Sequence, residues 1–529
     1  MSENNTGNNV LDMSRYRMEK LPKRDKSKTE KFLMKIGAPL AILSFFLIMF
    51  GDISFLHNFD ATALSSKAKL NLDTIGLANF IKANQAMLAI FVAALILWIT
   101  EAIPNYLTSL ILIISLVLTK VLSEEAAYAQ LGHKVMWLNI LSFILASMLV
   151  STGVAKRFAL WFIIKFGKNA SSIFLSFMVI NIILSLFISA TTAKAAILLP
   201  IFMVVAAVYG ASDGKRNNFG RSLVLQNLLQ INMGAAAFLT GSGANLLAAS
   251  LIAGAIGSDI FFSDWMMAAF PVALIIMLIG WFVANRIFFP LKKEERIPSI
   301  PGGMESLKKE LAGMGKVSFN EIKSLIIFGT ILAMWSTDRL HGISPTAVAF
   351  VGAIVALLPR IGIIKWNDVD IPWHLLLFSA GAYTLGAGFK VTDLPSISVN
   401  AFLDAVGIGE STPFWVIYIV LTGGMIFSAL AFQSKTMRTM IFVPIAIGIA
   451  NRFGYSVVSL ALPVAFLIEH VYVLPFNSKP ALLLYSTNHY SWTDTFKYGI
   501  TMQFVAWGVS ILMAMTYFKW LGITNGLFF

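Results

Sequence analysis

A short polar and positively charged motif occurs twice inside apolar sequence. The first copy is ATTAK at residues 190–194, and the second is SKTMR at residues 434–438, so matched positions are 244 residues apart. Each copy is followed at the same distance by a proline, Pro200 and Pro444. Hydroxyls and cations are costly in hydrocarbon, so their equivalent placement in two halves is typical of a polar solute site at a pseudo-twofold axis in a membrane. The pattern predicts a binding site for a small anion.

Two further polar interruptions occur in other apolar stretches, TGSGAN at residues 240–245 and FNSKPA at residues 476–481, about 236 positions apart. Glycine and proline break a helix there, and a broken backbone at membrane depth is tolerated where it lines a cavity or is buried in protein. Small residues alone could serve only close helix packing, but these breaks also carry polar side chains. The predicted substrate-binding residues are Thr191, Thr192, Ser242, Gly243, Asn245, Ser434, Lys435, Thr436, Ser478 and Lys479.

The composition indicates a membrane protein. Hydrophobic residues make up 57% of the 529 residues, charged residues only 13%, and the mean hydropathy is +0.77, whereas soluble proteins carry about 25% charged residues. Several apolar runs approach the ~20 residues that span a bilayer. We therefore expect an all-α polytopic fold. The chain contains no cysteine, which excludes disulfides and thiolate metal sites, and we expect no metal or cofactor.

The net charge of +13 follows the expected membrane topology. Basic residues crowd the N-terminal tail and several connecting segments, whereas residues 53–85 and 257–265 carry few net positive charges. The positive-inside rule predicts a cytoplasmic N-terminus. We further expect a multi-pass protein of the cell membrane, inner or plasma, from a bacterium. No basic surface is separable from the spans, so nucleic-acid binding is not expected.

The polar segment between Pro290 and Lys323 divides the membrane region into two comparable halves. The sequence therefore predicts a basic tail (1–34), a first repeat (35–290), a cytoplasmic linker (291–323) and a second repeat (324–529). Each repeat should contain a re-entrant hairpin, at about 172–210 and 413–453, and a broken helix, at about 222–257 and 457–489. Helix N-termini at the hairpin tips would favour carboxylates. An odd number of spans per half would make the repeats inverted.

At these residues the chain resembles the divalent anion/sodium symporter family of dicarboxylate and citrate transporters. The matching stretches include WITEAIP at 98–104, GSGAN at 241–245 and IPWHLLLFSAGAYTLGAGF at 371–389. The resemblance covers roughly residues 35–525. It implies about eleven spans with two re-entrant hairpins, a scaffold that forms a homodimer, and a transport domain that moves as an elevator. A transporter rather than an enzyme is expected.

The chain departs from the Ser-Asn-Thr that symporters of this family carry at both hairpin tips. Lys194, Lys435, Arg438 and Lys479 place cations where family symporters use neutral groups with bound sodium. Fixed cations offset the desolvation of a dianion but cannot dissociate, so an empty carrier would rarely cross. This predicts sodium-independent exchange of C4/C5 dicarboxylates such as succinate, malate, fumarate and 2-oxoglutarate, as in the antiporter branch of the family.

Other interpretations stay open at this point. Sodium-coupled dicarboxylate symport is the main alternative, an anion channel belongs to another class, and a sensor that binds without transport is a third. Lys194 and Arg438 could instead pair with backbone carbonyls or with Glu469. Asp338 is expected to brace the scaffold, and His470 to be structural rather than proton-coupling.

Overall fold

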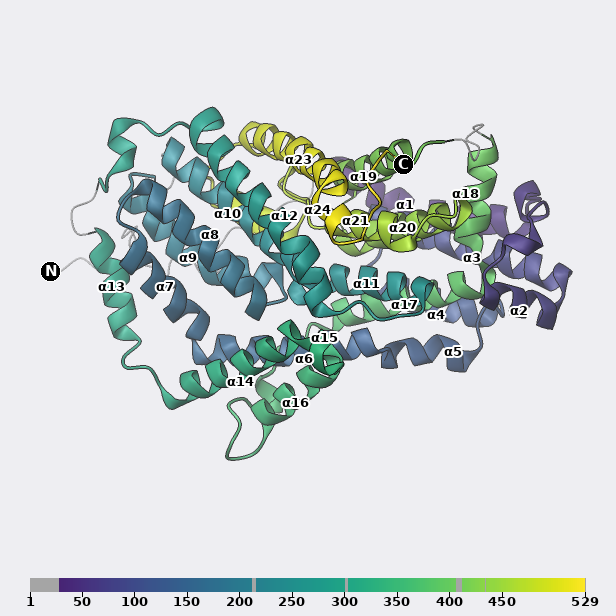
Figure 1. The fold of residues 1–529 in the computed structure, drawn as a ribbon, viewed down its shortest axis with the longest axis horizontal. Coiled ribbons are helices and arrows are strands. Elements are labelled where there is room, and N and C mark those ends of the chain that lie inside the picture. The colour runs from purple at the N-terminus through teal and green to yellow at the C-terminus, as the bar shows by residue number, and fades with distance from the viewer. Residues whose placement is uncertain (1–27, 212–215, 300–302, 406–411, 433, 529) are drawn as a thin grey trace.

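The computed structural model describes residues 28–211, 216–299, 303–405, 412–432 and 434–528, and every regular element in them is a helix (Figure 1). The predicted basic tail lies outside the described residues up to position 27. The helices of the first half are α1 (Lys28–Phe50), α2 (Ser66–Ile75), α3 (Leu77–Thr100), α4 (Asn105–Leu118), α5 (Glu124–Tyr128), α6 (Lys134–Thr152), α7 (Val154–Phe166), α8 (Ala170–Phe187), α9 (Thr191–Val208), α10 (Asn218–Ala237), α11 (Gly243–Ile256) and α12 (Phe262–Val283).

The second half repeats the same kinds of element. Its helices are α13 (Gly303–Gly313), α14 (Phe319–Ser336), α15 (Asp338–His341), α16 (Pro345–Leu357), α17 (Trp373–Thr392), α18 (Leu394–Ala405), α19 (Phe414–Phe427), α20 (Lys435–Arg452), α21 (Val457–Phe466), α22 (Lys479–Tyr485), α23 (Trp492–Met515) and α24 (Tyr517–Trp520).

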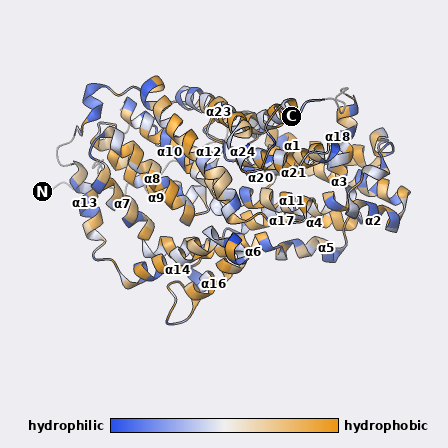
Figure 2. Cartoon of the chain, in the orientation of Figure 1, coloured by the Kyte–Doolittle hydropathy of each residue, from blue (hydrophilic) through white to orange (hydrophobic). Residues whose placement is uncertain are grey.

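Helix length and hydropathy agree with a polytopic membrane protein. Among the described residues, 7 helical segments are long and apolar enough to cross a bilayer, and six shorter apolar helices accompany them. Figure 2 shows hydrophobic residues along most helices, with hydrophilic residues concentrated on α2 and α13. The chain is therefore an all-α polytopic membrane protein, as its composition predicts.

Helices pack on one another both within each half of the chain and between the two halves. In the first half α8 and α9 both pack on α10, and in the second α20 packs on α21. Helices at the predicted hairpins also contact helices at the predicted breaks of the other half, since α9 packs on α22 and α20 packs on α11. Figure 1 shows α7, α8, α9 and α10 side by side at one end of the molecule, with α1 to α4 at the other. This reciprocal packing brings the two polar motifs toward a common centre.

Two polar clusters join helices that are far apart in the sequence. The buried carboxylate of Asp338 accepts hydrogen bonds from the backbone N–H of Phe262 (2.7 Å) and the hydroxyl of Ser263 (2.5 Å), which caps the start of α12. Arg157 on α7 pairs with Glu321 on α14 (2.6 Å). These contacts give Asp338 a capping role, and its part in a scaffold stays a prediction.

Candidate functional site

Four helices, α9, α11, α20 and α22, begin at the four predicted motifs. The residues that precede them have backbone dihedral angles that agree in pairs between the two halves. Ala190 and Ser434 precede α9 and α20 with φ, ψ of −84°, 109° and −92°, 119°. Ser242 and Ser478 precede α11 and α22 with −156°, 155° and −156°, 160°. The serines accept hydrogen bonds from backbone N–H groups three residues ahead, whereas Ala190 has no side-chain acceptor. The backbone thus repeats closely even where the residue types differ.

Lys194 is fully buried inside its own half of the molecule. Its amino group donates to the hydroxyl of Ser185 on α8 (2.7 Å) and to the carbonyl of Ile231 on α10 (3.3 Å). It also lies close enough to Glu469 and Lys435 to interact with them electrostatically. The lysine therefore contributes positive potential to the centre while its donors bond protein oxygens.

Arg438 is buried in the equivalent manner in the second half. Its guanidinium donates to the hydroxyl of Ser428 (2.8 Å), to the carbonyl of Ile468 (2.8 Å) and to the carbonyls of Met425 and Leu467. Burial of a charge requires such compensation. The alternative that the sequence left open, a basic residue held by backbone carbonyls, describes this arginine.

Lys435 lies between the two broken helices. Its amino group donates to the side-chain oxygen of Asn232 on α10 (3.0 Å) and forms an ion pair with Glu469, which follows α21. The other carboxylate oxygen of Glu469 accepts a hydrogen bond from the hydroxyl of Ser242 (2.6 Å). Glu469 is fully buried and Lys435 is 14% exposed. This contact chain joins the second hairpin to the broken helices of both halves.

The ion pair changes the charge that the sequence predicts for the centre. Lys194, Lys435 and Arg438 are accompanied by one buried carboxylate, Glu469, so the four groups carry a net charge of +2 when all are ionised. Lys435, one of the fixed cations that the sequence predicts for the site, is therefore paired with a carboxylate of the protein itself. Lys479, the first residue of α22, is exposed.

The remaining predicted residues divide into two groups. Asn245 turns its amide toward the break in its own helix and donates to the carbonyls of Ala235 (2.8 Å) and Phe238 (3.0 Å). These bonds satisfy backbone carbonyls at the break, so the asparagine stabilises it. The others are partly accessible to solvent. Gly243 is exposed, and the half-buried residues are Thr191, Thr192, Ser434, Thr436 and Ser478.

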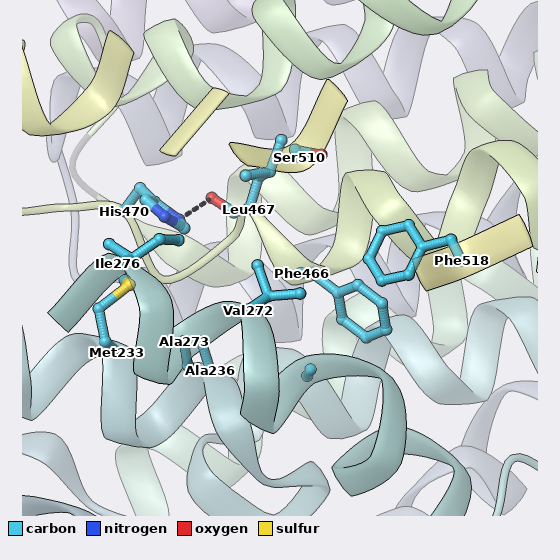
Figure 3. A pocket seen from close by; sticks show the side chains of 11 residues that line it. Met233, Ala236, Val272, Ala273, Ile276, Phe466, Leu467, His470, Ser510 and Phe518 are labelled. Carbon is cyan, nitrogen blue, oxygen red and sulfur yellow. Dashed lines mark hydrogen bonds between the residues drawn. The ribbon is translucent and has the colours of Figure 1, made fainter. Parts of the chain in front are cut away.

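His470 lines a small apolar cavity (Figure 3) and, within the described part of the chain, makes no hydrogen bond to Lys194, Lys435, Arg438 or Glu469. One ring nitrogen lies 3.3 Å from the carbonyl of Leu467, and the surrounding wall includes Met233, Ile276 and Phe466. The other ring nitrogen is buried and has no hydrogen-bond partner among the residues that the structure describes. Its surroundings resemble those of a packed structural side chain.

Asn232 contacts Lys435 in the site, although none of the polar motifs in the sequence includes it. Asn232 and Glu469 are 237 residues apart, as are Ile231 and Ile468, whose carbonyls accept from Lys194 and Arg438. This offset nearly equals that of the helix breaks and was available in the sequence. It was missed because an amide and a carboxylate do not look like a repeat.

Comparison with known proteins identifies relatives over most of the chain. A family model described as the sodium:sulfate symporter transmembrane region matches residues 77–524. A protein of Cupriavidus necator named only as a membrane protein is 26% identical, covering 83% of this chain and 88% of the relative. The sodium-dependent dicarboxylate transporter SdcS of Staphylococcus saprophyticus is 26% identical over 81% and 86%. The putative malate transporter YflS of Bacillus subtilis is 27% identical over 63% and 69%.

Proposed function

The chain belongs to the sodium:sulfate symporter family, and from that premise we propose that it is a secondary transporter that carries C4/C5 dicarboxylates across the membrane. Two relatives are named as transporters of dicarboxylate or malate. The family description also names sulfate, another dianion. The proposal therefore has to be supported by the chain's own residues as well.

The observation that carries the proposal is the net charge of the buried cluster. Three cations and one carboxylate leave +2 at the place where α20, α10 and α11 meet. A dianion bound there would balance that charge and recover part of its lost hydration. The N-termini of α9, α11, α20 and α22 add backbone donors whose partial positive charge favours carboxylates.

Two forms of coupling each have one observation in their favour. The named relatives include sodium-dependent dicarboxylate transporters, which favours sodium-coupled symport. Lys435, the first residue of α20, donates from its amino group to Asn232 on α10, and a fixed cation at this motif favours exchange without sodium. Carrying an uncompensated charge through hydrocarbon costs roughly 2.5–3.5 kcal/mol on insertion scales, so the residual +2 would hinder return of the empty protein.

Uptake into proteoliposomes tests both the substrate and the coupling. Radiolabelled succinate is offered to empty vesicles and to vesicles preloaded with unlabelled succinate, each with external Na⁺ or choline, and protein-free vesicles serve as the control. Uptake only into preloaded vesicles and without regard to Na⁺ supports exchange. Sodium-driven uptake into empty vesicles supports symport. Radiolabelled sulfate is offered in parallel, and uptake of sulfate without uptake of succinate would make sulfate the substrate in place of a dicarboxylate.

The remaining expectations concern architecture and location. We propose that the protein is a homodimer in the bacterial cell membrane, with a cytoplasmic N-terminus, and that the hairpin helices move as an elevator against α1 to α6. An anion channel is the contrasting class. Recordings in planar bilayers distinguish them, because a channel passes current far faster than a carrier turns over.

A further inference from the structure

The carboxylate of Glu469 lies between two residues that the sequence predicts to bind substrate. One oxygen accepts from the hydroxyl of Ser242, the residue that caps α11, and the other pairs with the amino group of Lys435, the first residue of α20. A hydroxyl and an ammonium on separate helices are the donors expected for one carboxylate of a bound anion. In this structure a carboxylate of the protein itself takes both.

The pseudo-symmetry of the chain does not require an acid at this position. The equivalent residue in the first half is Asn232, an amide, and it also bonds Lys435 (3.0 Å). The residue equivalent to Lys435 is Thr191. Acid and base therefore occur together in the second half, and neither occurs at the matched positions of the first.

We propose that Glu469 is a resident carboxylate that occupies one carboxylate-binding position of the empty site, and that a carboxylate of the substrate displaces it from Lys435 and Ser242. The identity of that substrate rests on the proposed function. Glu469 would then lower the affinity for the anion by competing with it. It would also keep Lys435 compensated when no substrate is bound, since an unpaired buried ammonium is strongly unfavourable.

The local structure suits such a displacement. Glu469 lies in the irregular segment between α21, which ends at Phe466, and α22, which begins at Lys479. Its side chain can therefore turn away without unwinding a helix. Lys435, at 14% exposure, retains some access to solvent, whereas Lys194 and Arg438 are fully buried. Of these three cations, Lys435 is the one that an incoming carboxylate can reach.

The test measures anion binding to purified full-length protein by its stabilisation against thermal unfolding, with succinate and sulfate titrated separately. Glu469→Gln removes the competing charge and is expected to bind the anion about tenfold more tightly or better, the scale of one charge-assisted hydrogen bond. Glu469→Asp keeps the charge but is one methylene shorter, so it should compete less well and give an intermediate affinity. Asp338→Asn is the matched control, because it alters another fully buried carboxylate that accepts two hydrogen bonds, and its anion affinity should equal that of the wild type.

Each outcome bears on the proposal. Unchanged or weaker binding in Glu469→Gln, with a normal unfolding transition, overturns it and makes Glu469 a residue that only positions Lys435. If Glu469→Gln does not fold, the Asp variant decides by the same criterion. Stabilisation by sulfate but not succinate would reject the proposed substrate, and the variants would then be judged on sulfate. If neither anion stabilises any of these proteins, both proposals fail.

Discussion

Lys194 and Arg438, 244 residues apart, each donate a hydrogen bond to a serine hydroxyl of the preceding segment: Ser185 on α8 for the lysine, and Ser428, which directly follows α19, for the arginine. Each also donates to a backbone carbonyl, that of Ile231 on α10 for the lysine and that of Ile468, just after α21, for the arginine. Both cations therefore fasten a hairpin to the helix beside it. They supply positive potential to the centre, but their donors are already used by the protein.

Replacement of Arg438 by Lys should lower stability more than substrate affinity. A lysine cannot reproduce the planar guanidinium, which donates to the hydroxyl of Ser428 and to the carbonyls of Ile468 and Met425. We expect a loss of about 1–3 kcal/mol, seen as a lower melting temperature, with an unchanged KM for uptake. Arg452→Lys is the control, because Arg452 ends the same helix and pairs with the exposed Asp404. A raised KM at unchanged melting temperature would instead place Arg438 on the substrate.

Removal of the Lys435 ammonium should lower the free energy of unfolding, because the buried carboxylate of Glu469 then lacks a cation. Lys435→Met leaves Glu469 without its cation, and breaking a buried pair in this way costs about 3–5 kcal/mol. Adding Glu469→Gln to Lys435→Met should restore much of that stability, which a double-mutant cycle of unfolding free energies would measure. Neither variant should take up succinate. Additive effects in the cycle would contradict the ion pair.

Lys435→Asn should make the protein respond to sodium. It creates Ser-Asn-Thr at the second tip, the sequence that family symporters carry, and leaves the carboxylate of Glu469 free to attract a cation. We expect Na⁺, compared with choline, to raise both the melting temperature and the initial rate of uptake. A variant whose response to Na⁺ equals that of the wild type would count against the fixed-cation interpretation of Lys435.

Arg157→Ala should loosen the connection between α13 and α14. The guanidinium bonds Glu321 and the carbonyls of Met314 and Gly315 (2.9 Å each). We expect limited proteolysis to cut near residues 313–317 several times faster than in the wild type, because this segment loses two hydrogen bonds and α14 loses the ion pair at Glu321. Lys156→Ala is the neighbouring control. Lys156 pairs with a partly exposed Glu310, so its loss should change cleavage little.

The helical pairs α8–α9 and α19–α20 can be predicted from the sequence, because the two polar motifs within them match in residue type and in their spacing along the chain. Helices α8 and α9 lie within residues 170–208, and α19 and α20 within 414–452, close to the limits of 172–210 and 413–453 predicted for the hairpins. Asn169 caps the start of α8 with its side chain, and asparagine before an apolar run is a signal that can be read in a sequence. The re-entrant arrangement of these helices stays a prediction. The ion pair of Lys435 was not predicted. Glu469 lies 34 residues away in an apolar stretch, and which of three nearby cations it would meet depends on side-chain packing that spacing does not encode.

The reciprocal packing of α9 on α22 and of α20 on α11 also constrains how the protein can be made. A ribosome adds about 5–20 residues per second, so the first hairpin emerges many seconds before α22, which begins at residue 479. During that interval α9 lacks one of its packing partners inside the bilayer or the insertion machinery. Assembly must therefore end at the C-terminal part of the chain, and a truncation before residue 479 should leave the first hairpin exposed to membrane quality control.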